Sequence, residues 1–158
     1  MSERSLFTNF WTTESKTTRN VLARIPEGSD YRPDPKSRTA KEIAWQIVCE
    51  EKMMIDALEN GKAEWAPPPL PATMHEVLGA YEKQSAEMPQ RWKELPDARW
   101  DGTLEFFGRQ RPASAMAWSF LFDIVTPSTY KRFLSKYPWQ TSSMSASATP
   151  WAWYRTDS

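Results

Sequence analysis

The strongest constraint on the fold is the helical periodicity of residues 39–60, TAKEIAWQIVCEEKMMIDALEN. Apolar side chains recur there at the 3.6-residue spacing of a helix and form a stripe more than about 100° wide, which is typical of a helix packed against its neighbours. The members of the stripe are Ile43, Trp45, Ile47, Val48, Met54, Ile55 and Leu58. Thr39 and Glu42 have the spacing of a capping box, and Gly61 is suited to end the helix.

The same spacing predicts a helix over Leu6 to Ile25. Its centre is rich in threonine, which has a low helix propensity, so packing against the rest of the chain must hold it. One side is formed by Leu6, Phe10, Thr13, Thr17, Val21 and Ile25, with Phe7, Trp11 and Leu22 beside it. Pro26 and Gly28 are expected to stop this helix.

Two more helices are predicted in the second half of the chain. Thr73 to Leu95 begins with a second capping box of Thr73 and Glu76, and Pro89 inside it predicts a kink or a break. Pro112 to Val125 is almost wholly apolar, and Pro112 suits the first turn of a helix. This last helix is therefore expected to be central and buried on several sides.

Proline-rich or long connections separate these helices. Residues 26–38 contain three prolines, which forbid helix. Residues 65–71, WAPPPLP, form a polyproline-like crossing, for which a stiff connection is favoured over a ligand for an SH3-type domain. Residues 96–111 are a long connection whose Phe-Phe-Gly run suits a short extended piece over one end of the helices. The predicted fold is all-α, an up-down four-helix bundle over residues 1–136 with an irregular Ser-, Ala- and Trp-rich tail over 137–158.

Polar side chains at three positions are the candidates for a pocket in this bundle. Gln46 and Glu50 are four residues apart, so they point the same way along one ridge of their helix. Such a ridge is either a half-exposed border or the wall of a pocket. Asp123 lies near the end of the apolar helix, where a carboxylate is either solvated or else paired, protonated or bound to a metal. We therefore predict a pocket lined by Gln46, Glu50 and Asp123.

Composition excludes several classes of partner. The 20 basic and 20 acidic side chains cancel and no basic patch stands out, so no nucleic-acid binding is expected. No apolar run approaches the roughly 18 residues of a membrane span, and the first residues lack the apolar core of a signal peptide. The single cysteine rules out an internal disulfide. These features predict a cytoplasmic protein with no membrane association.

Motifs that carry known chemistry are absent. The sequence has no glycine-rich phosphate loop, no pair of cysteines and only one histidine, so a three-histidine metal site is impossible. Cys49 lies beside apolar residues and is interpreted as a packed core residue, and His75 as a surface residue. Glu50, Glu51 and Asp123 could still assemble a carboxylate site for a hard cation, although such sites usually need more oxygen ligands.

Three segments, in order, resemble the DinB/YfiT-like superfamily of bacterial four-helix bundles. The first is FWTTESKTTRNVLARIPEGSDYRPDPKSRTAKEIAWQIVCEEKMM, the second WAPPPLPATMHEVLGAYEK and the third RPASAMAWSFLFDIV. The resemblance covers about residues 5–125 and rests on similar segments rather than on a catalytic signature. It implies a bundle that holds Zn or Ni on three ligands, usually histidines, one from the second helix and two from the fourth. Members with assigned roles include thiol-dependent transferases and isomerases, and homodimers occur.

This sequence departs from the family pattern at each ligand position. The first position carries Gln46, whose neutral amide is a poor ligand for Zn or Ni. The second falls on Asp123, which is able to coordinate a metal, and the third on Pro127, which is not. Asp123 and Glu50 remain the candidate metal ligands. These residues do not predict the standard metal site of the family.

Three hypotheses about function follow. The first is a DinB-like protein that lacks the metal triad and acts as a small-molecule-binding or catalytically impaired bundle. The second is an active divalent-metal-dependent transferase or hydrolase of the thiol-dependent type, with Glu50, Asp123 and waters around the metal. The third is a homodimeric structural or interaction protein, because tryptophan is enriched at interfaces.

Overall fold

Three long helices make up most of residues 1–28, 32 and 35–122, the part of the chain that the computed structural model describes. They are α1 (Glu3–Leu22), α2 (Ala40–Asn60) and α3 (Met74–Glu94). The short helix α4 (Asp97–Trp100) and three strands, β1 (Lys62–Ala63), β2 (Thr103–Phe106) and β3 (Arg109–Pro112), complete the labelled elements. Residues 113–122 are helical as well, where the last apolar helix was predicted. The end of that helix and the predicted tail 137–158 lie outside the described residues.

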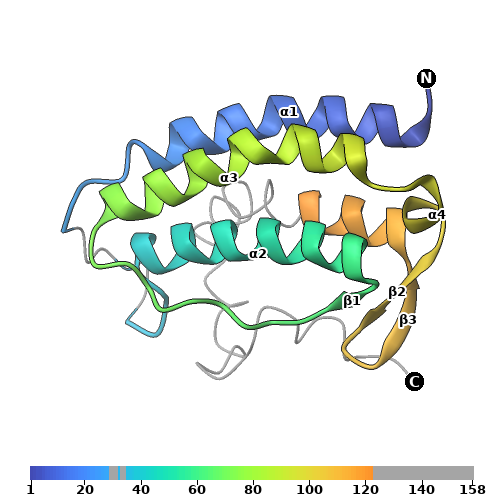
Figure 1. The fold of residues 1–158 in the computed structure, drawn as a ribbon. Helices are drawn as coiled ribbons and strands as arrows, with labels where there is room; N and C mark the ends of the chain where they lie inside the picture. Colours follow the sequence, from blue (N-terminus) through green and yellow to red (C-terminus); the bar gives the residue numbers. More distant parts are fainter. Residues whose placement is uncertain (29–31, 33–34, 123–158) are drawn as a thin grey trace, which may run out of the picture.

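Helices α2 and α3 run in the same direction, which corrects the predicted up-down order (Figure 1). Hydrogen bonds join Glu51 to Tyr81 and Glu59 to Arg91, so residue numbers rise together along the two helices. Helix α1 runs the opposite way to α3. The proline-rich crossing makes the parallel order possible, because it leads the chain back along α2 before α3 begins. The Trp45 indole Nε1 fixes this crossing by donating to the Pro68 carbonyl oxygen at 3.0 Å.

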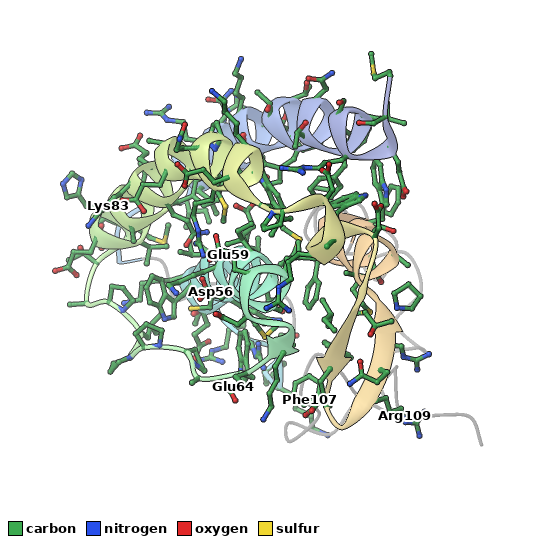
Figure 2. The ribbon with its side chains drawn as sticks, turned by 45° about the vertical axis from the view of Figure 1, so that its right-hand side comes forward. Asp56, Glu59, Glu64, Lys83, Phe107 and Arg109 are labelled. Atoms are coloured by element: carbon green, nitrogen blue, oxygen red, sulfur yellow. The ribbon has the colours of Figure 1, made fainter. Side chains whose placement is uncertain are left out.

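A small sheet corrects the prediction of an all-α chain. Its strand order is β1-β2-β3, with β1 parallel to β2 and β2 antiparallel to β3. The Phe-Phe-Gly run suggested an extended piece, and it contributes the end of β2 and the hairpin tip, where Phe107 and Arg109 lie in Figure 2. Phe107 and Gly108 make the turn with φ angles of 47° and 80°. Strands of two and four residues show too little alternation to be recognised in the sequence.

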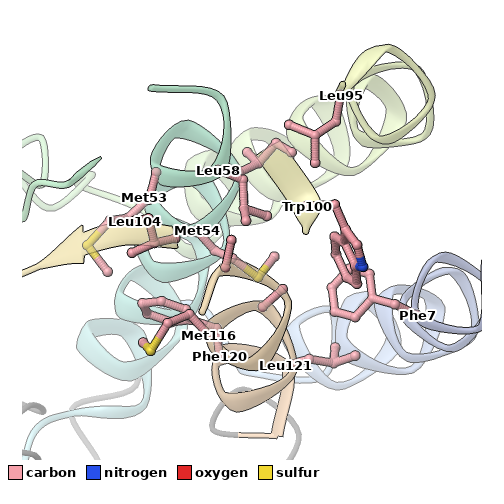
Figure 3. Close-up of a cluster of buried hydrophobic side chains, with 14 of the residues drawn as sticks. Phe7, Met53, Met54, Leu58, Leu95, Trp100, Leu104, Met116, Phe120 and Leu121 are labelled. Atoms are coloured by element: carbon pink, nitrogen blue, oxygen red, sulfur yellow. The ribbon is translucent and has the colours of Figure 1, made fainter. Parts of the chain in front are cut away.

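The core consists of two clusters of buried side chains along the helices. The larger lies at the end where α2 and α3 finish, and it includes residues of α1, α4, β2 and the 113–122 helix (Figure 3). Phe7 of α1 is central to it, with its ring centroid 5.0 Å from that of Trp92 and 5.1 Å from those of Trp100 and Trp118. The smaller cluster consists of Leu22, Ala44, Val48, Met74, Val77 and Tyr81.

The face that α1 buries differs from the predicted one. The structure buries Phe7, Trp11, Ser15 and Leu22. Leu6, Phe10 and Val21, which were expected on the principal apolar side, are 52%, 38% and 47% exposed. Both sets have helical spacing, so periodicity alone could not choose between them. The buried set contains the Trp11 indole and the Phe7 ring, which pack against Trp92 and Trp100. These contacts explain the choice, because aromatic side chains bury the most apolar area.

The predicted helix ends are confirmed at α2 and α3. Both capping boxes form, at Thr39 with Glu42 and at Thr73 with Glu76, and Gly61 ends α2 with a φ of 80°. The predicted kink or break at Pro89 did not become a break, because α3 continues through it. None of the helices in the described part of the chain is both long and apolar enough to cross a membrane.

An ion-pair network between α2 and α3 gives a testable measure of their parallel packing. The Arg91 guanidinium contacts Asp56 and makes two hydrogen bonds to Glu59, of 2.9 and 2.6 Å. Asp56 and Glu59 are labelled on α2 in Figure 2. These carboxylates hold the pKa of Arg91 above its usual range. We predict that Arg91→Ala lowers the free energy of unfolding by about 1.5 kcal/mol in urea titrations, because charge-assisted bonds between two helices are lost.

The matched control is Lys52→Ala, which removes the other cation on Asp56. Lys52 is 58% exposed and pairs within one helix. Its loss is therefore expected to cost less than about 0.5 kcal/mol. Equal losses in the two variants would contradict the role of Arg91 between the helices.

Candidate functional site

Gln46 and Glu50 of the predicted pocket lie together on α2. Gln46 is half-buried and Glu50 is 5% exposed. The Gln46 side-chain amide donates to the Glu50 carboxylate at 2.5 Å. The Arg38 guanidinium, which precedes α2, donates to the Gln46 amide oxygen. A polar row thus links a cation, an amide and a carboxylate, namely Arg38, Gln46 and Glu50. The third residue of the predicted pocket, Asp123, lies outside the described residues.

The polar row does not fit a transition metal. The amide oxygen is the one atom of Gln46 that is able to coordinate a metal, and it already accepts a hydrogen bond from a cation. A guanidinium at hydrogen-bonding distance repels a divalent ion, and a neutral amide is a weak ligand for Zn or Ni. Among the described residues, no three or more His, Cys, Asp or Glu side chains gather into a metal-binding group. Pro127, on which the resemblance predicts a third ligand, has no coordinating atom in its side chain.

A buried carboxyl group, which the sequence analysis did not assign to the pocket, lies one residue beyond Glu50. Glu51 is 1% exposed and lies along α2 between the residues of the two core clusters. The Tyr81 hydroxyl of α3 lies 3.1 Å from its Oε1 and 3.3 Å from the Ser15 carbonyl oxygen of α1. The Gln84 side chain, whose Nε2 donates to the Val48 carbonyl oxygen at 3.1 Å, lies near Glu51. The sequence does carry a signal for the burial of Glu51, because Glu51 comes three residues after Val48 and so falls on the buried stripe of α2.

Burial controls the electrostatics of this group. Loss of solvation raises the pKa of Glu51 from 4.5 to about 7, against the opposing effect of the Tyr81 hydroxyl and the Gln84 side chain. Burial, and then the nearby Glu51 carboxyl, raise the pKa of the Tyr81 hydroxyl above its usual range. The pair is therefore a weak acid beside a neutral phenol at neutral pH. Perturbed groups of this kind are found at functional sites and also in purely structural networks.

The other reactive side chains singled out in the sequence are not activated. Burial, followed by the charge of Glu50, raises the pKa of the Cys49 thiol to about 11, so the reactive thiolate is not formed at neutral pH. Cys49 is 8% exposed, as expected for a packed core residue. His75 is exposed in the first turn of α3, as predicted, where its backbone N–H donates to Glu27 at 3.2 Å.

An open polar groove of about 500 Å³ lies away from the predicted pocket, between the start of α1 and the end of α3. The Arg4 guanidinium at its edge contacts Asp97 at 2.6 Å and the carbonyl oxygens of Trp92 and Lys93, so both of its terminal nitrogens are engaged. The groove is lined by Ser2, Arg4, Ser5, Thr8, Asn9, Thr12, Pro89, Trp92, Lys93 and Asp97. Its width and hydroxyl-rich lining make it a weaker candidate for a specific ligand than the row of Arg38, Gln46 and Glu50.

The buried carboxyl group predicts a distinctive dependence of stability on pH. A carboxyl group whose pKa is raised in the folded state contributes stability fully below pH 4.5 and loses it as the pH rises through about 7. We predict that the unfolding free energy of the wild type, taken relative to that of Glu51→Gln, falls by about 2.5 kcal/mol between pH 5 and pH 8. Urea titrations at both values measure it.

Glu87→Gln, at an exposed position of α3, is the control and is expected to follow the wild type at both pH values. The same pH dependence in Glu51→Gln and in the wild type would show that Glu51 is not the titrating group.

Comparison with known proteins supports the fold. No family model matches the sequence, and no curated protein matches it. A crystal structure of a DinB-like protein, YjoA from Bacillus subtilis, superposes with a TM-score of 0.58, covering 81% of this chain and 87% of that one. The two sequences are 14% identical, which is a likeness of fold. The chain has the DinB-like fold that the order of its segments predicted.

Proposed function

We propose that this DinB-like chain binds a small organic molecule beside Gln46 and Glu50, without the metal triad of the family it resembles. One observation supports the proposal: the Gln46 amide is hydrogen bonded to Arg38 through its oxygen and to Glu50 through its nitrogen. A cation, an amide and a carboxylate in one row offer both donors and acceptors, which suits polar groups of an organic ligand.

The wider arrangement around this row belongs to the same proposal. We infer that the helix beginning at residue 113 completes a four-helix bundle and brings Asp123 close to Gln46 and Glu50. The buried, unactivated Cys49 thiol agrees with a cytoplasmic location, since no disulfide chemistry is built into the chain.

Metal content tests the part of the proposal that concerns the missing metal triad. We predict that the purified, tag-free protein contains less than about 0.1 Zn, Ni or Mn per chain, because Gln46 and Pro127 cannot complete a ligand set. Elemental analysis of the wild type, Gln46→Ala and Asp123→Ala is the measurement, with Glu87→Gln as the control for adventitious binding. All four proteins are expected to give the same low value.

One metal ion per chain that is lost in Asp123→Ala would overturn the proposal. That result would instead support the alternative, an active divalent-metal-dependent transferase or hydrolase of the thiol-dependent type. Assays with low-molecular-weight thiols would then be the next step.

A second candidate function is self-association as a homodimeric interaction protein. The observation that favours it is the exposure of Leu6, Phe10 and Val21 on one side of α1, together with Phe122. Large apolar side chains that gather on one surface are typical of an interface rather than of chance exposure. A mass of 18.3 kDa in solution would show a monomer and exclude this function.

A further inference from the structure

The outer side of α1 carries a continuous exposed stripe. Its members are Leu6, Phe10, Thr13, Thr17 and Val21, and all of them are exposed. They are three or four residues apart, so they lie on one face along nearly the whole helix. Figure 1 shows α1 at the outer edge of the molecule. We call these five residues the outer stripe.

Aromatic side chains of the 113–122 helix widen the apolar surface beside Phe10. The Phe10 ring centroid lies 6.1 Å from that of Trp118 and 6.4 Å from that of Phe122. Trp118 and Phe122 stack on each other at 6.0 Å with an interplanar angle of 24°. Phe122 is 52% exposed, so this aromatic group continues the outer stripe at the surface.

We propose that the outer stripe binds the same stripe of a second copy of this chain, with the two α1 helices antiparallel. This interface rests on the second candidate function, self-association, and specifies its surface and register. The order of residues along the stripe is self-complementary about its centre. A two-fold axis between Thr13 and Glu14 aligns Leu6 with the partner's Val21 and Phe10 with the partner's Thr17, so that large side chains face smaller ones.

Charge along α1 selects the antiparallel orientation. Glu3 lies at the start of the outer face, where its carboxylate accepts a hydrogen bond of 3.1 Å from the Trp118 indole. Arg24 lies just beyond the end of α1 and is exposed. The same two-fold axis aligns Glu3 with the partner's Arg24, whereas a parallel pair would align like charges. Opposite charges at the rim of an interface fix its register more than they add affinity.

Thr13 lies closest to the proposed axis and allows a direct test by cross-linking. In oxidising buffer, Thr13→Cys is expected to form a disulfide between two chains. The neighbouring variant Thr12→Cys, on the side of α1 that lines the groove, is expected to stay unlinked. The native Cys49 is buried and does not compete.

Mass in solution tests the surface independently. Sedimentation or light scattering is expected to give twice the 18.3 kDa chain mass for the wild type. Leu6→Glu and Val21→Glu are each expected to weaken the dimer at least about tenfold, because a charge is buried against an apolar side chain. Their circular dichroism spectra are expected to match that of the wild type, which would show that each chain keeps its fold.

A charge reversal tests the register. Arg24→Glu is expected to weaken the dimer, and adding Glu3→Arg to it is expected to restore the wild-type dissociation constant. A monomeric wild type would overturn both self-association and this interface. A dimer that tolerates Leu6→Glu and Val21→Glu, or that cross-links equally through Thr12→Cys, would keep self-association and overturn the α1 interface.

Discussion

The hydrogen bond between Tyr81 and Glu51 is the contact on which the helix arrangement depends. It joins α3 to α2 inside the core, and the Tyr81 hydroxyl also reaches the Ser15 carbonyl oxygen of α1. Apolar side chains alone tolerate a shift of one helical turn, because their contacts have no direction. A buried carboxyl group does not, since a shift would leave it without a partner at a cost of several kcal/mol. The parallel register of α2 and α3 is therefore fixed by a polar contact.

The buried polar atoms of this core that lack hydrogen-bond partners cost folding free energy, which the apolar contacts must offset. Glu51 Oε2 and the indole nitrogens of Trp11 and Trp92 are buried without hydrogen-bond partners in the described part of the chain. Each such group opposes folding by about 1–3 kcal/mol. Phe7 and Trp11 both pack against Trp92 in the larger core cluster. These rings bury large apolar surfaces, which opposes that cost. Keeping Glu51 as a neutral acid reduces the cost further, because the uncharged form loses less solvation.

The features that sequence reasoning found are those that short-range chemistry determines. The caps at Thr39 and Thr73 and the end at Gly61 depend on residues within one helical turn. The features it missed depend on distant partners. The sheet requires Lys62 to pair with Glu105, and the buried side of α1 was chosen by Trp92 and Trp100, far along the chain. Glu51 was passed over because only a folded core shows that its position on the stripe is fully enclosed.

Fold and chemistry place different demands on a chain of this kind. A helical core requires apolar volume in the right order, and many sequences supply it, which is how 14% identity coexists with a shared DinB-like fold. A metal centre requires particular donor atoms within a few tenths of an ångström, so single substitutions abolish it. An amide at position 46 would be poorly placed beside a divalent ion, but with Arg38 on one side and Glu50 on the other it completes a hydrogen-bonded row. This hydrogen-bonded row is therefore physically consistent with the proposed recognition of an organic ligand.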